Sequence, residues 1–90
     1  MARLSEDDIR DRLRTVPQWT RQGDQIRRTY ELPSFAEAIA FVNRVAGIAD
    51  AADHHPDILI EYRRVTLTLS THDAGGLTER DFRVASSIDA

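Results

Sequence analysis

The chain has no cysteine among its 90 residues, so it cannot depend on the disulfide framework typical of small secreted domains. It also lacks any apolar run near the roughly 18 residues that a transmembrane helix needs. Its N-terminal stretch, MARLSEDD, contains no apolar region of the kind that a secretory signal requires. These absences predict a cytoplasmic protein with no membrane partner.

Basic residues are fewer than acidic residues in this chain. Twelve basic residues stand against 15 acidic ones, and the resulting net charge of -3 is opposite to the footprint of a nucleic-acid-binding protein. Glycine is scarce, and the Gly75-Gly76 pair has neither the longer glycine pattern nor the lysine of a phosphate-binding loop. We therefore expect no nucleic-acid partner and no phosphate loop.

The composition is that of an ordinary globular chain, with 41% hydrophobic and 30% charged residues. Ninety residues suffice for a single domain, over residues 1-90, with one modest core. At this size, association with further subunits is a common source of additional stability. A single domain is the simplest expectation.

Three helix starts are marked by capping residues. Ser5 precedes three acidic residues and begins a helix that Pro17 should end. Ser34 stands three residues before a glutamate, the spacing of a capping box, and predicts a helix that runs to about Asp53. Thr78 caps a last helix. The chain therefore contains an early, a central and a C-terminal helix.

Two stretches between the helices alternate apolar and polar residues, which indicates strands. Trp19 opens the first stretch, which turns at Gly23-Asp24 and returns to Leu32. The second stretch runs from Ile58 to Ser70 and turns near Arg63. The order α-β-β-α-β-β-α predicts an α+β fold, with a four-stranded antiparallel sheet and three helices packed on one face.

The central helix carries a wide apolar arc. Phe35, Ile39 and Val42 belong to one stripe at helical spacing, and Phe41 and Val45 belong to a second stripe beside it. Such an arc is wider than one sheet face would cover. The surplus predicts that a partner subunit covers part of this helix.

All three histidines lie in or near one stretch of the chain: His54 and His55 before Pro56, and His72 after the last predicted strand. Histidine can both give and take a proton near neutral pH, so a cluster suggests acid/base chemistry. The alternative for the His-His pair is a favourable charge at a helix end, and for His72 a surface side chain. A metal site made from Asp53 and the three histidines is disfavoured, because adjacent histidines suit one ion poorly.

The order and spacing of these residues resemble the pterin carbinolamine dehydratases, also called 4a-hydroxytetrahydrobiopterin dehydratases. The matching pattern is an acidic residue, then His-His-Pro, an aromatic residue, a further histidine after a strand, and an aspartate in the last helix. The chain meets it with Asp50, His54, His55, Pro56, Tyr62, His72 and Asp81, and the run from Ser70 to Asp81 is similar to the family throughout. Many members have a glutamate in place of Asp50. The resemblance extends from about Leu4 to Asp89.

The resemblance implies a hydro-lyase that removes water from 4a-hydroxytetrahydrobiopterin to give quinonoid dihydropterin, without a cofactor or metal, in tetrahydropterin recycling. It assigns proton donation and acceptance to His54 and His72, and holding of the pterin ring to His55. The residues implied in substrate binding are Asp50, Asp53, Asp81, Trp19 and Thr71. Trp19 also has a core interpretation, and Asp81 can serve as a helix cap.

The resemblance also implies partners. The dehydratases form homodimers or homotetramers through sheet edges and the central helix, and an aromatic amino acid hydroxylase supplies their substrate. Some relatives bind the dimerisation segment of a transcription factor. A protein-binding module that acts as a dimerisation or regulatory cofactor is therefore the alternative function.

Overall fold

The computed structural model describes residues 2–90, and its helices and strands follow one another in the predicted order. A short 3-10 helix, η1, follows the last strand. The elements in chain order are α1 (Glu6–Leu13), β1 (Thr20–Gln22), β2 (Gln25–Glu31), α2 (Phe35–Ala52), β3 (Asp57–Glu61), β4 (Arg64–Leu69), η1 (His72–Ala74) and α3 (Glu79–Asp89). The predicted α-β-β-α-β-β-α order is confirmed.

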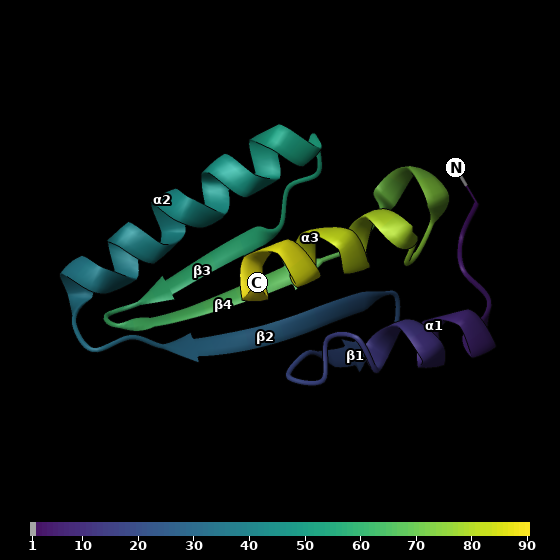
Figure 1. The fold of residues 1–90 in the computed structure, drawn as a ribbon, viewed down its shortest axis with the longest axis horizontal. Coiled ribbons are helices and arrows are strands. Elements are labelled where there is room, and N and C mark those ends of the chain that lie inside the picture. Colours follow the sequence, from purple (N-terminus) through teal and green to yellow (C-terminus); the bar gives the residue numbers. More distant parts are fainter. Residues whose placement is uncertain (1) are drawn as a thin grey trace.

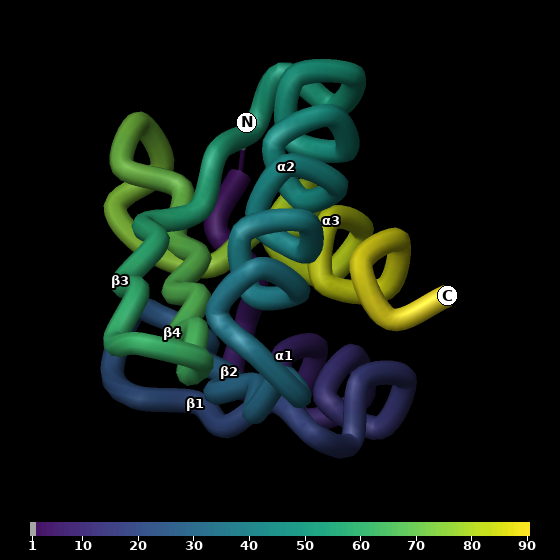
Figure 2. The backbone as a smooth tube through the Cα atoms, turned by 90° about the vertical axis from the view of Figure 1, so that its left-hand side faces the viewer, coloured from purple at the N-terminus to yellow at the C-terminus, as the bar shows by residue number. Residues whose placement is uncertain are grey.

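The four strands form one antiparallel sheet in the order β1-β2-β4-β3. The last hairpin therefore pairs with the first through β4, and β1 and β3 are the sheet edges (Figure 1). All three α-helices cover the same face, as the turned view in Figure 2 shows. The predicted α+β fold, with helices on one face of the sheet, is confirmed.

The core lies between this covered face and the helices. On β4 the alternation is complete, because Val65, Leu67 and Leu69 are fully buried while the residues between them are not. Apolar side chains from all three helices, from β2 and from the connecting segments complete the core: Ile9, Val16, Trp19, Ile26, Ala38, Val45, Leu77, Phe82, Val84, Ala85 and Ile88. The open face of the sheet is left to polar side chains such as Thr29 and Thr66.

Helix α1 ends earlier than predicted. It stops at Leu13, four residues before Pro17, although Ser5 caps its start by accepting a hydrogen bond from the Asp8 amide. Beyond Leu13 the chain tightens into turns in which the amides of Thr15 and Val16 bond to carbonyls three residues back. The hydroxyl of Thr15 also bonds to one of these carbonyls at 2.6 Å. The expectation that Pro17 ends the helix is therefore wrong.

Helix α2 has a marked start and a marked end. The Ser34 hydroxyl accepts a hydrogen bond from the Glu37 amide at 3.1 Å, as predicted. The helix stops at Ala52, because Asp53 adopts a left-handed conformation with φ 49° and the His54 amide bonds back to the Ala49 carbonyl. His54 therefore lies just beyond the helix, whose end agrees with the predicted run to about Asp53.

The apolar arc of α2 is mostly covered within the chain. Val45 is buried, and Phe41, Val42 and Ile48 pack against the core, while Phe35 is exposed. The other exposed large apolar side chains lie on or beside the edge strand β3: Ile58, Leu59, Ile60 and Tyr62. Within residues 2–90, most of the exposed large apolar side chains thus lie on or beside β3, not on the central helix.

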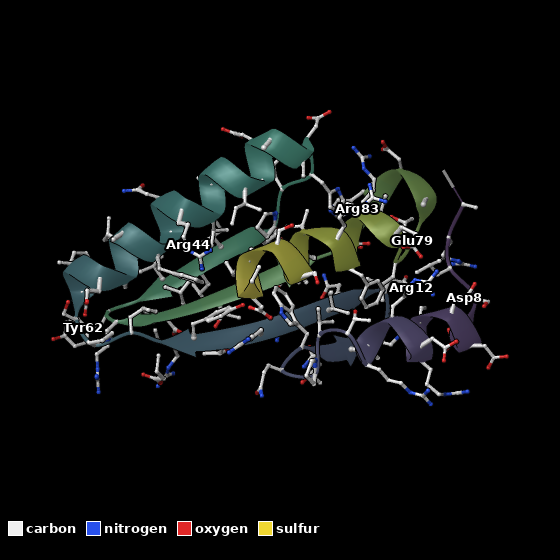
Figure 3. The ribbon with its side chains drawn as sticks, in the orientation of Figure 1. Asp8, Arg12, Arg44, Tyr62, Glu79 and Arg83 are labelled. Atoms are coloured by element: carbon white, nitrogen blue, oxygen red, sulfur yellow. The ribbon has the colours of Figure 1, made fainter. Side chains whose placement is uncertain are left out.

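Contacts between polar side chains tie the helices together (Figure 3). Arg44 on α2 donates a hydrogen bond to the Ile88 carbonyl near the end of α3, at 2.9 Å, and lies between the two helices in the figure. Arg12 on α1 pairs with Glu79 on α3. Within residues 2–90, no helix is long and apolar enough to cross a membrane.

The C-terminal end of α3 is fixed by Asp89, whose carboxylate accepts hydrogen bonds from Trp19 Nε1 at 2.8 Å and from the Tyr30 hydroxyl at 2.5 Å. Arg28 lies 3.1 Å from the same carboxylate. Burial raises the pKa of Tyr30, and the bond to Asp89 raises it further. The phenol is therefore stabilised in its neutral form.

Tyr30 gives a test of this packing at high pH. Its pKa in the unfolded chain is about 10, and the folded pKa is higher, so its contribution to stability is complete below about pH 10 and is lost as the pH rises further. We expect the free energy of unfolding, from urea denaturation, to fall between about pH 10 and 11.5 in the parent and less in Tyr30→Phe. Tyr62→Phe, at an exposed site, should behave as the parent. Parallel losses in parent and Tyr30→Phe would contradict the assignment.

Candidate active site

His54 is buried and fixed by an aspartate from another part of the chain. Its ring Nε2 lies 2.6 Å from Oδ1 of Asp81, a fully buried residue in the first turn of α3. The left-handed conformation of Asp53 directs the chain from α2 toward β3 at this point and brings His54 to Asp81. Twenty-seven positions along the sequence separate the two residues.

Asp81 has each of its oxygens engaged. Its Oδ2 accepts hydrogen bonds from the Thr71 hydroxyl at 2.8 Å and from the Thr78 amide at 2.9 Å, and the two threonine hydroxyls lie 2.8 Å apart. The predicted cap at Thr78 is present and, together with Asp81, forms a capping box. Asp81 therefore serves both as a helix cap and as the partner of His54.

This network fixes which nitrogen of His54 is available. An ionised carboxylate only accepts hydrogen bonds, so Nε2 of His54 carries the hydrogen that faces Asp81. Within residues 2–90, every buried side-chain nitrogen or oxygen has a hydrogen-bond partner. Nδ1 of His54 has none among these residues. Nδ1 must therefore reach the surface, where His54 lines a cleft.

That cleft brings all three histidines together. It has a volume of about 330 Å³, at the lower end for ligand sites, and is lined by Asp53, His54, His55, Ser70, Thr71, His72, Asp73 and Arg80. The residues come from the turn after α2, from the segment after β4 and from η1, with Arg80 on α3. Five of the predicted residues therefore line one site: Asp53, His54, His55, Thr71 and His72. A sixth, the buried Asp81, contacts His54.

His55 and Asp50 form a second imidazole-carboxylate pair, at the rim. His55 Nε2 lies 2.8 Å from Asp50 Oδ1, and both side chains are exposed. Asp50 contacts His55 and is not among the residues that line the cleft. Its direct contact with substrate stays a prediction.

Trp19 lies in the core. Its ring is buried, its Nε1 donates to Asp89, and it is not among the residues that line the histidine cleft. Its role in substrate binding stays a prediction, to which the cleft geometry adds no support. The core interpretation of this residue agrees with its position.

Three lining residues were not among the predicted site residues. Arg80 donates a hydrogen bond from Nη2 to the Asp53 carbonyl at 3.0 Å and thereby ties α3 to the turn that carries His54. Its position next to Asp81 was a signal available in the sequence. Ser70 lies two residues before His72, and Asp73 follows it directly. Their closeness to His72 in the sequence would have pointed to both.

A larger hollow, of about 510 Å³, lies on the open face of the sheet. It is lined by threonines, charged residues and two apolar residues of β3, and it contains no histidine. The smaller cleft is the better candidate because it alone of the two has groups suited to proton transfer near neutral pH. Among residues 2–90, no cluster of three or more histidine or carboxylate side chains has an arrangement that could hold a metal ion.

Comparison with known proteins gives a consistent result. The family model described as pterin 4 alpha carbinolamine dehydratase matches residues 2–90. A relative from Roseiflexus sp. is 60% identical over 87 residues, covering 97% of this chain and 94% of its own, and one from Chloroflexus aurantiacus is 55% identical over 89 residues, covering 99% and 96%. Both bear the name "Putative pterin-4-alpha-carbinolamine dehydratase".

Two solved structures are similar. The crystal structure of a transcriptional coactivator/pterin dehydratase from Brucella melitensis matches with a TM-score of 0.92 and 32% identity, over 97% of this chain and 95% of that one. A pterin dehydratase-like protein identified as a RuBisCO assembly factor in the alpha-carboxysome matches with a TM-score of 0.64 and 21% identity, over 79% and 82%. The second likeness is one of fold alone.

Proposed function

Because the chain belongs to the pterin 4 alpha carbinolamine dehydratase family, we propose that its histidine cleft removes water from a tetrahydropterin that carries a hydroxyl on carbon 4a. The family is one of hydro-lyases, and its reaction requires no redox partner. One observation carries the proposal: three imidazoles line one cleft, and a buried carboxylate orients one of them.

The reaction needs two proton transfers. A proton must reach the departing hydroxyl, which leaves as water, and another must leave the neighbouring ring nitrogen, so that a carbon-nitrogen double bond forms. An acid and a base on different parts of one cleft meet this need, and each such group typically contributes about 10²- to 10⁴-fold in rate.

His54 is suited to the role of base. Its Nε2 hydrogen is directed to Asp81, so the neutral ring offers Nδ1 as an acceptor at the surface of the cleft. Asp81 would also stabilise the imidazolium that forms when Nδ1 takes a proton. His72 is then the acid, since it lines the same cleft, is exposed and comes from another element, η1.

The other residues would hold the substrate. His55, oriented by Asp50, would contact the pterin ring, and Asp53 could accept from its polar edge. The Thr71 hydroxyl is bonded to Asp81 and Thr78, so in this proposal Thr71 is a positioning residue that helps to hold Asp81. In this scheme, the substrate is the product of an aromatic amino acid hydroxylase, and the reaction belongs to tetrahydropterin recycling.

Stopped-flow absorbance tests the function directly. Freshly generated 4a-hydroxytetrahydropterin is mixed with the parent protein or with a His54→Ala, His72→Ala double variant, and the formation of quinonoid dihydropterin is followed. Acceleration by the parent alone supports the proposal. A folded parent that gives no acceleration would refute it.

A second candidate function is protein binding, which the exposed apolar residues of β3 favour. Within residues 2–90, β4 alone pairs with β3, so the outer backbone edge of β3 is open to another chain. Another copy would give the homodimer or homotetramer expected for the family. A different protein would make this chain a regulatory module, as the coactivator name of the Brucella relative suggests.

Light scattering distinguishes these cases. If copies associate through β3, the parent should be larger than a monomer, and Leu59→Lys on β3 should reduce its mass because the lysine charge would be buried at the contact. Thr20→Lys on the other edge strand, β1, is the matched control. A monomeric parent would leave β3 free for a different protein and would count against self-association.

A further inference from the structure

The loop that carries His72 is closed at its base by a small bridge. The Thr71 amide donates to the Gly76 carbonyl at 3.1 Å, and the Gly76 amide donates back to the Thr71 carbonyl at 3.3 Å. Within the loop, the Gly75 amide donates to the His72 carbonyl at 3.0 Å. The position of His72 therefore depends on the backbone of Gly75 and Gly76.

The N-terminal segment ahead of α1 lies beside this base. The Leu4 amide donates to the Leu77 carbonyl at 2.9 Å, and the Leu4 side chain packs against the core. Figure 1 shows the segment near the turn of η1 on its way to α1. Its other end is also held, because Arg21 on β1 donates to Glu6 on α1 at 2.9 Å. Arg3 therefore extends from a segment that is fixed to the fold.

The stem of Arg3 packs on the backbone of Gly76. Gly76 is buried, and a Cβ atom placed on it would lie 2.5 Å from Cδ and 3.1 Å from Cγ of Arg3. Gly76 does not have a positive φ, so the absence of a side chain matters there for space and not for backbone conformation. The Arg3 guanidinium also donates to the Gly75 carbonyl, but at 3.3 Å this bond is long, so the packed stem is the main contact.

The three histidines of the cleft are held in different ways. His54 is bonded to Asp81 and His55 to Asp50, whereas within residues 2–90 the side chain of His72 forms no hydrogen bond. The ring of His72 is therefore placed by the backbone of its loop. If the loop shifts, the ring moves with it, and a misplacement of about 1 Å can cost about 10²-fold in rate.

We propose that the Arg3 stem on Gly76 is a clasp that holds the His72 loop in place, which makes Arg3 a positioning residue for the reaction. This inference rests on the proposed function, because it takes His72 to be the acid of the cleft. Arg3 is not among the residues that line the histidine cleft. It therefore acts through the position of His72 and not by contact with the substrate.

Arg3→Ala removes the clasp and should lower kcat for dehydration about tenfold, with KM nearly unchanged because the pterin ring is held elsewhere. Arg3→Lys retains Cγ and Cδ and should keep most of the parent kcat. The matched control is Arg14→Ala, which removes an exposed arginine that does not line the cleft. Stopped-flow absorbance gives kcat and KM, and urea denaturation establishes that each variant is folded. Parent-like kcat in a folded Arg3→Ala would overturn the clasp.

Double variants distinguish positioning from a general effect on the fold. In a His72→Ala background, Arg3→Ala should cause no further loss of kcat, because the ring that it positions is gone. A further tenfold loss in that background would overturn the inference.

Gly76→Ala tests the contact from its other side. Its methyl group should displace the Arg3 stem and lower kcat about as much as Arg3→Ala does. When residue 3 is already alanine, Gly76→Ala should have little effect, since the remaining neighbour, Oδ1 of Asp24, lies at an ordinary contact distance of 3.4 Å. Equal losses from Gly76→Ala in both backgrounds would contradict the clasp.

Nuclear magnetic resonance tests the clasp without turnover. Single histidine variants assign the imidazole resonances, and Arg3→Ala should shift or broaden those of His72 while those of His54 stay as in the parent. The Gly76 amide, which is bonded to the Thr71 carbonyl, should exchange its hydrogen faster in Arg3→Ala. Unchanged His72 resonances and unchanged Gly76 exchange would overturn the clasp. Absence of dehydration by a folded parent would refute the proposed function separately.

Discussion

Replacing His72 with alanine is expected to slow dehydration about 10²- to 10⁴-fold, the range typical for one general acid or base. The loss should appear in kcat at saturating substrate, because the missing proton is needed in the transition state. His72 is exposed, and within residues 2–90 its side chain forms no hydrogen bond. The variant should therefore fold as the parent does, which urea denaturation can check.

His55→Ala is the matched comparison, because His55 is also an exposed histidine of the cleft. If it holds the pterin ring, its loss should raise KM and change kcat less than the loss of His72 does. Stopped-flow absorbance over a range of substrate concentrations separates the two effects. The acid/base assignment fails if His72→Ala, while folded, turns over as fast as the parent.

Asp81→Asn should retain the fold and lose the reaction. The asparagine oxygen would take the place of Oδ2, where the Thr71 hydroxyl and the Thr78 amide donate, and its NH₂ group would then face His54. His54 would have to accept this bond at Nε2 and carry its hydrogen on Nδ1, so it could no longer accept a proton from the cleft. We expect kcat to fall at least about 10²-fold.

Asp81→Ala should instead damage the fold. It leaves the Thr78 amide, the Thr71 hydroxyl and His54 Nε2 buried without their acceptor, and stranded partners of this kind cost about 1 to 3 kcal/mol. We expect the free energy of unfolding to fall by about 3 kcal/mol, a large share of the roughly 5 to 15 kcal/mol typical of a small domain.

Urea denaturation of both Asp81 variants, with Asp57→Ala as an exposed control, separates catalysis from stability. Asparagine should be much more stable than alanine at this position and yet equally inactive. Near-parent activity in a folded Asp81→Asn would show that the orientation of His54 by a carboxylate is not required.

The order of the elements was predictable because the signals that set it are local. Ser34 and Thr78 cap helices through bonds that span three residues or fewer, and the alternation along β4 is visible in the sequence without knowledge of its neighbours. The ends of helices were less predictable. The end of α1 depended on tight turns, while the end of α2, predicted to within one residue, depended on the left-handed Asp53, which no glycine marks.

The candidate site was predicted in part for the same reason. The histidine motif identified His54, His55 and His72, and resemblance to a family supplied the chemistry. The contact of His54 with Asp81 and the donation from Arg80 to Asp53 could not be derived from spacing, because each joins residues 27 positions apart.

By itself, the sequence determined the elements and their order, because caps, turns and alternation act between near neighbours, and it supplied the histidines proposed for the chemistry. Only the tertiary structure decided that β4 pairs with β2, that most exposed large apolar side chains lie on or beside β3, and that His54 meets a buried Asp81. These features depend on which distant segments become adjacent when the apolar faces of the helices and the sheet are buried together. Which segments become adjacent therefore depends on contacts along the whole chain.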